Sequence, residues 1–225
     1  IESYDKVSYE DFKDIKYDNS FPSKFNYNFM NISIVETLKL KEENDLFELL
    51  DIIQKWDRKA DTDSHGAGIY GILYYQLVWN FRNEIYENDN TVSKETLLSA
   101  LREVKRYLFD NFGSIDITLG DFQKLVRGDK EIPIWGLPDV ITAMSSRPYK
   151  EGKNKVTQGE SYIGLVRFNE KGPILESIMS YGNSDDPDSD HYTDQMENYS
   201  KFQTKKMTFD RDEIYKEAKK IYNPN

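Results

Sequence analysis

Apolar side chains recur every three or four residues in three stretches of the chain, which is the spacing of one buried helix face. The first stretch follows Asn44 and Asp45, the second follows Asp63 and Ser64, and the third begins after Ser93. Asn, Asp and Ser are favoured N-cap residues, so each stretch carries its own start signal. The apolar positions are Leu46, Leu49, Leu50, Ile53, Ile69, Ile72, Leu73, Leu77, Leu97, Leu98, Leu101, Val104 and Leu108. The pattern predicts a helical block over residues 44–112, with these side chains as its core.

Residues 159–225 follow a different pattern. Two runs rich in β-branched and aromatic residues, 163–168 and 173–179, flank a short polar connection that ends in Gly172. Such a pair predicts an antiparallel β-hairpin, and Gly172 can take a positive φ in its turn. Asp210 then begins a capping box, which predicts a closing helix. The buried side of that helix is expected to consist of Ile214, Ala218 and Ile221.

The rest of the chain gives less regular patterns. Ser8 begins a capping box and predicts a short helix near the start. Residues 120–128 predict a short amphipathic helix, and residues 146–158 predict a loop because they are charged and marked by Gly and Pro. A further helix face is expected at Phe25, Phe29, Ile32 and Leu38. The sequence thus predicts an α+β chain, mainly helical with a late antiparallel β-hairpin, in four segments: 1–43 (a helix and loop segment), 44–112 (the helical block), 113–158 (a short helix and loops) and 159–225 (the β-hairpin and closing helices).

Composition narrows the class of protein. The chain has 225 residues, of which 38% are hydrophobic and 31% charged, and its net charge is −10. We therefore expect no nucleic-acid partner, because binding phosphates requires a basic face. We expect no membrane partner either, because no run approaches the ~20 apolar residues of a membrane helix. The absence of cysteine excludes disulfides, thiol catalysis and thiolate zinc sites.

An acidic turn at residues 185–190 allows two interpretations. Carboxylates occur at positions 1, 3, 5, 9 and 12 of an EF-hand-like calcium loop, a hard-cation pattern that ends in a bidentate Glu. However, His191 stands where that loop requires Gly, and Pro187 stands at its second position. The alternative is an acidic turn whose Ser189 or Asp190 caps a following helix. The carboxylates of the calcium interpretation are Asp186, Asp188, Asp190, Asp194 and Glu197.

The same region carries a longer motif. Gly-Asn-Ser at residues 182–184 is followed by Ser-Asp-His-Tyr-Thr-Asp-Gln at 189–195 and then by Tyr199. Far upstream, Trp-Asp at residues 56–57 is followed by an acidic spacer, Asp-Ser and a small-residue helix start at residues 63–68. Glycine and alanine at such a helix start leave room for close packing.

Two further patches lie between these motifs. One is a Gly-start helix that ends in Arg-Gly at residues 127–128, followed by Gly-x-x-Asp at residues 136–139. The other is the late β-hairpin itself. The four ordered patches, which run from Trp56 to Phe209, resemble the second half of the penicillin acylase family, which are amidases of the N-terminal-nucleophile hydrolase superfamily.

The resemblance implies a fold and a mechanism. Members of this family fold as an αββα sandwich and are cut autocatalytically into two chains, and the second chain begins with a nucleophilic Ser. The α-amino group of that Ser is the base, because an α-amine with a pKa near ~7.7 accepts protons near neutral pH. Ile1 cannot be that nucleophile, and the Asn that supplies an oxyanion donor is not recognisable in this sequence. The resemblance therefore places this chain in the C-terminal part of the β subunit, with no catalytic residue in the chain and no cofactor.

The resemblance also implies a setting. The parent protein would remove an acyl chain from an amide such as a penicillin or an N-acyl-homoserine lactone, in the periplasm or outside the cell. Its substrate would be a small acyl-amide. This chain's partner would be the remainder of the same precursor, namely the α chain and the N-terminal part of the β chain. A two-stranded hairpin is not stable alone, so apolar surface should be exposed where the missing parts pack.

The side chains that match the family's motifs allow two interpretations: they contact the substrate, or they support the fold. We expect support of the fold, because nothing in the sequence supplies a nucleophile beside them. The same alternatives apply to His65, as ligand or exposed first-turn residue, and to Trp135, as pocket wall or core. The family-signature residues are Trp56, Asp57, Asp63, Ser64, Gly182, His191, Tyr192, Asp194 and Gln195. Two alternative functions stay open, namely a calcium-binding module and a catalytically inactive homologue that acts as a scaffold.

Overall fold

The computed structural model describes residues 6–22, 44–87, 89 and 91–218. The helix face expected between residues 23 and 40, and the expected buried position Ile221, lie outside the described residues. The chain divides into two compact units. One comprises Glu10–Gly159, and the other combines Glu160–Asn225 with Ile1–Tyr9.

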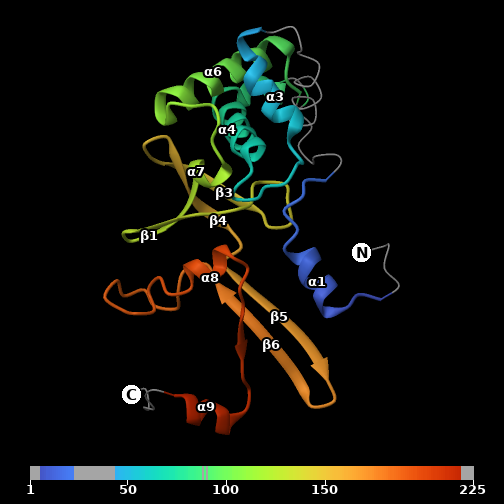
Figure 1. Ribbon diagram of the computed structural model, residues 1–225, viewed down its shortest axis with the longest axis vertical. Helices are drawn as coiled ribbons and strands as arrows, with labels where there is room; N and C mark the ends of the chain where they lie inside the picture. The colour runs from blue at the N-terminus through green and yellow to red at the C-terminus, as the bar shows by residue number, and fades with distance from the viewer. Residues whose placement is uncertain (1–5, 23–43, 88, 90, 219–225) are drawn as a thin grey trace. The chain divides into compact units, whose positions relative to one another are not determined.

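The unit Glu10–Gly159 contains the predicted helical block. Its helices are α1 (Tyr9–Lys16), η1 (Asn44–Leu46), α3 (Phe47–Lys55), α4 (His65–Asn80), α5 (Arg82–Glu87), α6 (Lys94–Phe112) and α7 (Leu119–Phe122). Figure 1 shows α4 between α3 and α6, and α4 also contacts α7. Most of helix α4 is buried, and its buried residues run consecutively from Gly66 to Leu73, as in a helix that packs against neighbours on several sides.

Two helix boundaries follow the expected caps, but the cap expected at Asn44 and Asp45 is wrong, because the N-cap of α3 is Leu46 and no side chain caps it. The side-chain oxygen of Ser64 accepts a hydrogen bond from Ala67 N at 3.2 Å, and that of Ser93 accepts one from Thr96 N at 3.1 Å. Gly113 ends α6 in the left-handed conformation, at φ +69°. These local signals place the two longest helices in the described part of the chain where the sequence predicts them.

A four-stranded sheet occupies most of the segment that was expected to be a short helix and loops. Its strands are β1 (Gln123–Arg127), β2 (Lys130–Pro133), β3 (Met144–Lys150) and β4 (Lys153–Gly159), in the order β2-β1-β4-β3. Neighbours are antiparallel except for β1 and β4, which are parallel. The loop prediction for residues 146–158 is therefore wrong, and the late hairpin is not the only β-structure in the described part of the chain.

The physical reason for this error is the position of the charges. Along β4, Asn154 is buried while Lys155 is exposed, so the charged side chains occupy one face of a pleated strand. The Gly in this segment is a turn residue, because Glu151 and Gly152 both have positive φ and join β3 to β4. Similarly, the helix predicted over residues 120–128 ends at Phe122, and β1 follows.

The second unit contains the predicted hairpin. Strands β5 (Tyr162–Asn169) and β6 (Gly172–Met179) pair antiparallel, and β7 (Lys205–Met207) adds to β6. Gly172 has the positive φ expected of it, +114°. Two short helices complete the unit, α8 (Met196–Ser200) and α9 (Arg211–Glu217).

The unit has a small core and exposed apolar positions. Ile163, Leu165 and Tyr199 are buried. Asp210 caps α9 as predicted. The expected burial of Ile214 and Ala218 is wrong, since Ile214 is 48% exposed and Ala218 is also exposed. Within the described part of the chain, β5 pairs only with β6, so its outer edge is unpaired.

Candidate functional site

The motif at residues 182–195 forms a closed turn between β6 and α8. Gln195 N donates to Tyr181 O at 2.8 Å, and Ser184 N donates to His191 O at 3.2 Å. The Gln195 side chain is buried, and its Oε1 accepts a hydrogen bond from Met179 N at 3.1 Å. Gln195 thus joins the end of a strand to the start of a helix, as a buried amide that satisfies a backbone donor.

Gly182 is required by close approach within this turn. A Cβ on residue 182 would overlap the carbonyl oxygen of His191 and would lie 2.7 Å from Asp194 Oδ1. The backbone of residue 191 therefore crosses directly over Gly182. This contact explains a glycine at the start of the motif without any role in binding.

His191 and Asp194 form an exposed dyad. Nδ1 of His191 lies 2.8 Å from Asp194 Oδ2, and the imidazole is 64% exposed. Such a carboxylate orients an imidazole for proton transfer. No hydroxyl in the described part of the chain is hydrogen-bonded to the imidazole, so a nucleophile is not part of this arrangement. Tyr192 belongs to the same turn, where its N–H donates to Ser189 O at 3.0 Å.

The acidic residues before the dyad are turn residues, and the expectation that Ser189 or Asp190 caps the following helix is wrong, because the N-cap of α8 is Gln195. Asp186 Oδ1 accepts a hydrogen bond from Asp188 N at 3.0 Å, and Ser189 Oγ accepts one from His191 N at 3.1 Å. Among the described residues, no group of three or more His, Cys, Asp or Glu side chains gathers as a metal site requires. The structure therefore does not assemble a calcium site from Asp186, Asp188, Asp190 and Glu197.

The second motif forms a loop before α4. Trp56 Nε1 donates to Lys59 O at 2.9 Å, and Asp57 Oδ1 accepts from Lys59 N at 3.0 Å. The Trp56 ring stands where a side chain on Gly66 would be, so the loop folds back onto the helix start. Further along, Gly136 N donates to Ala60 O at 2.9 Å. Trp56 and Asp57 thus shape a loop to which a distant segment is anchored.

Ser64 joins this loop to α7. Besides capping α4, its carbonyl oxygen accepts a hydrogen bond from Leu119 N at 2.9 Å. Gly68 lies directly against α7's N-cap, because a Cβ there would be 2.9 Å from the carbonyl carbon of Thr118. Asp63 is exposed and does not cap the helix.

The other two residues singled out from the sequence have structural surroundings. His65 Nδ1 lies 2.7 Å from Asp116 Oδ1, and both side chains are exposed. Trp135 is buried at 2% exposure. Neither His65 nor Trp135 lines the groove between α4, α6 and the β3–β4 hairpin.

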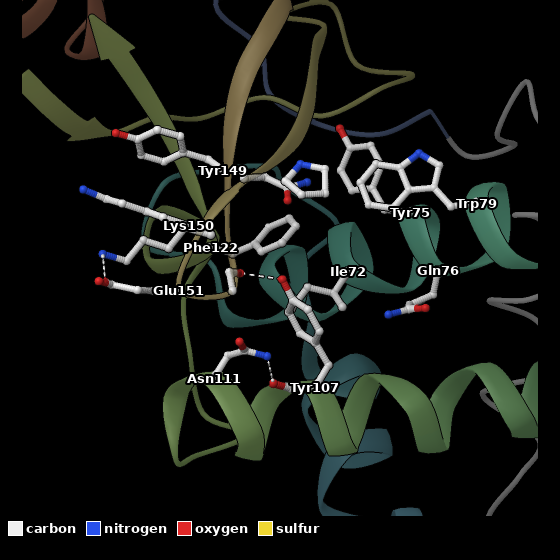
Figure 2. Close-up of a pocket in the computed structure, with 14 residues that line it drawn as sticks. Ile72, Tyr75, Gln76, Trp79, Tyr107, Asn111, Phe122, Tyr149, Lys150 and Glu151 are labelled. Carbon is white, nitrogen blue, oxygen red and sulfur yellow. Dashed lines mark hydrogen bonds and ion pairs between the residues drawn. The ribbon is translucent and has the colours of Figure 1, made fainter. Parts of the chain in front are cut away.

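That groove lies between α4, α6 and the β3–β4 hairpin (Figure 2) and has a volume of about 350 Å³. Its apolar wall includes Tyr75 and Trp79, whose rings stack with centroids 4.9 Å apart. The polar wall includes Tyr107, whose hydroxyl donates to Gly152 O at 2.6 Å. The groove is at the small end of ligand sites.

Burial raises the pKa of both tyrosine hydroxyls that line the groove. It raises the pKa of Tyr75, although hydrogen bonds from Ser146 oppose this effect, and it raises the pKa of Tyr107. Both are neutral hydroxyls near pH 7 and cannot act as bases there. The sequence assigned this part of α4 to ordinary core; the signal for a groove was the aromatic pair Tyr75 and Trp79, one helical turn apart.

One family model and several curated proteins match this chain. The penicillin amidase family model matches residues 1–216. Acyl-homoserine lactone acylase PvdQ of Pseudomonas savastanoi pv. phaseolicola is 29% identical over 184 residues, which cover 72% of this chain and 23% of that protein. PvdQ of Pseudomonas putida is 32% identical over 182 residues, which cover 71% of this chain and 22% of that protein.

Among solved structures, a thermostable penicillin G acylase from Alcaligenes faecalis matches with a TM-score of 0.43 and 14% identity, over 92% of this chain and 48% of that chain. The chain spans less than a quarter of the length of the curated relatives cited above. In the described part of the chain, no helix has both the length and the apolar character needed to cross a membrane.

Proposed function

This chain belongs to the penicillin amidase family, and we propose that it is part of an amidohydrolase that removes an acyl chain from an amide. The observation that carries the proposal is the family match over residues 1–216. The substrate we propose is a small acyl-amide, either an N-acyl-homoserine lactone or a penicillin. The N-acyl-homoserine lactone is proposed because the two curated relatives cited above are named acyl-homoserine lactone acylases.

The catalytic serine lies upstream of this chain in our proposal. An N-terminal Ser with its own α-amine as base is a complete nucleophile–base pair, so the reaction does not need a base from this chain. The His191–Asp194 dyad has no hydroxyl partner among the described residues, which supports a structural role for it. The coverage of the relatives, less than a quarter of their length, leaves ample sequence for the reactive centre elsewhere.

The role that we assign to this chain is to complete the fold of the parent enzyme. We propose that the αββα sandwich takes up β5–β6–β7 and that further strands, from the rest of the precursor, pair with the free edge of β5. Val166, Leu175 and Met207 stand opposite one another across these three strands. Val166 is 50% exposed, and burial of such apolar surface would stabilise the assembly.

The parent protein would be processed autocatalytically into two chains and would act in the periplasm or outside the cell. In this setting, this chain would contact only the remainder of its precursor, and no cofactor would take part. The signature residues Trp56, Gly182 and Gln195 would hold the loops of this region in shape.

The test is to express the full parent and assay acyl-nitroanilides, an N-acyl-homoserine lactone and a penicillin. We expect hydrolysis of at least one of these by the processed parent and none by the 225-residue chain alone. A processed parent with an intact N-terminal Ser that hydrolyses none would contradict the proposed activity and favour an inactive scaffold. Turnover by the isolated chain would contradict the upstream position of the nucleophile.

A further inference from the structure

Three cationic side chains stand in a row across the four-stranded sheet. Arg147 on β3 pairs with Lys155 on β4, and Lys155 pairs with Lys124 on β1. The neighbouring residues Gln123 and Asn154 are buried on the opposite face, so the three cations share the outer face. Such a row is unexpected in a chain of net charge −10.

One carboxylate near this row is engaged by other lysines. Glu131 on β2 forms ion pairs with Lys150 at 3.2 Å and with Lys153 at 3.3 Å. Within the described part of the chain, no carboxylate forms an ion pair with any member of the row. The Lys155 ammonium instead lies 5.4 Å from the centre of the Tyr149 ring, which holds it on this face.

The row places like charges on three neighbouring strands. Like charges directly opposite each other across a sheet repel, and neighbouring strands are only about 4.8 Å apart. The pKa of Lys124 is lowered, first by burial and then by the nearby Lys153, although the charges of Glu131 and Asp121 oppose this effect. A bound anion would remove this repulsion, since it would place negative charge among the cations.

We propose that Arg147, Lys155 and Lys124 bind a phosphate group. Three cations over two strand spacings match one multivalent oxyanion, which an arginine can hold through two parallel hydrogen bonds and a lysine as a point charge. The same chemistry is found in free phosphate and in a phospholipid headgroup. The site does not depend on the proposed amidase activity.

The experiment titrates the full chain at constant ionic strength with inorganic phosphate in one arm and with phosphatidylglycerol vesicles in the other, using phosphatidylcholine vesicles as the blank. The variants are Lys155→Gln and Arg147→Gln. The matched control is Lys94→Gln, which removes the same charge from an exposed position on α6, outside the sheet. Thermal unfolding of each variant is measured without anion.

We expect saturable binding in one arm, weakened about fivefold by each row variant and unchanged by Lys94→Gln, as for loss of one of three close charges. The arm that saturates identifies the source of the phosphate group. Lys155→Gln should also raise the melting temperature of the anion-free chain, because it relieves repulsion. No saturation in either arm, or an equal loss with Lys94→Gln, would overturn the proposal.

Discussion

The carbonyl oxygen of His191 occupies the space that a side chain on residue 182 would need. A Cβ at Gly182 would overlap this oxygen and would lie 2.7 Å from Asp194 Oδ1. The first glycine and the histidine of the motif are therefore linked by packing. The motif specifies the path of a turn, and its residues can be tested as parts of the fold.

Gly182→Ala should destabilise the second unit by about 1–3 kcal/mol, the usual cost of forcing atoms into a packed site. The control is Gly164→Ala in β5, where the nearest atom is 3.0 Å away and belongs to the exposed Tyr162 side chain, which can move. The measurement is hydrogen exchange at the amides of Ser184 and Gln195. Equal protection in both variants would contradict the packing explanation.

Gln195→Met should cost about 1–3 kcal/mol, because it keeps the volume but leaves the partly buried Met179 N–H without its acceptor. Gln203→Met is the matched control, since Gln203 is exposed. Exchange at the Met179 amide reports the lost hydrogen bond directly. An unchanged Met179 amide in Gln195→Met would contradict the role of the buried amide.

Gly68→Ala and Gly71→Ala should change the free energy of unfolding in opposite directions, although both gain about 1 kcal/mol of helix propensity in α4. At Gly68 the new Cβ would lie 2.9 Å from backbone of Thr118, whereas at Gly71 it would meet a Leu137 methyl group at 3.2 Å. We expect Gly68→Ala to lower the free energy of unfolding by about 1–3 kcal/mol.

The measurement for this pair is urea unfolding followed by tryptophan fluorescence. The three tryptophans, Trp56, Trp79 and Trp135, all lie in the unit Glu10–Gly159. Equal midpoints for the two variants would show that α4 tolerates a side chain against Thr118.

Asp121 should stabilise α7 in a pH-dependent way. Burial raises its pKa, but the hydrogen bonds from Thr118 and the charge of Lys124 outweigh burial, so the pKa in the folded protein is below the ordinary value of 3.8. Its contribution is therefore complete above pH 3.8 and is lost as the pH falls through the lower, folded pKa.

Asp121→Asn should cost about 0.5–1 kcal/mol at pH 7, as expected for a carboxylate in a first helical turn. This cost should shrink towards zero in acid below the folded pKa. The control is Asp110→Asn, at an exposed position on α6. A penalty for Asp121→Asn that stays constant with pH would contradict the capping role.

The apolar side chains Val166, Leu175 and Met207, which lie side by side on β5, β6 and β7, should bind a dye that fluoresces on apolar surfaces. Val166→Thr keeps a β-branched side chain in the strand and should reduce this signal, because it adds a polar group to the row. Ile141→Thr is the matched control, since Ile141 is exposed to the same degree in the other unit, 51% against 50%. Equal losses in both variants would contradict a binding face for the rest of the precursor.

Local signals in the sequence were sufficient for the caps and the hairpin. Ser64 and Ser93 cap the helices that they were expected to begin, because a cap acts within three residues. The hairpin was predictable since its strands are joined by the two residues Glu170 and Lys171, which Gly172 follows. In contrast, β1 and β4 pair in parallel across about thirty residues, and no local pattern specifies such a pair.

In the candidate sites too, local sequence patterns predicted some features, and only the structure revealed the others. The motif identified the turn that contains Gly182 and Gln195, but only coordinates show that His191 crosses over Gly182. The capping box at Asp210 predicted α9 correctly. The spacing of apolar residues predicted the burial of Ile214 wrongly, because periodicity says nothing about which surface covers a helix. The row Arg147, Lys155 and Lys124 depends on strand register, which the sequence did not reveal.

The most direct test of the central claim is to label the active parent enzyme with a serine-reactive inhibitor and to map the label by peptide mass spectrometry. The account predicts loss of acyl-amide hydrolysis together with a label on an N-terminal Ser outside these 225 residues. A label on any residue of this chain that accompanies the loss of activity would contradict it.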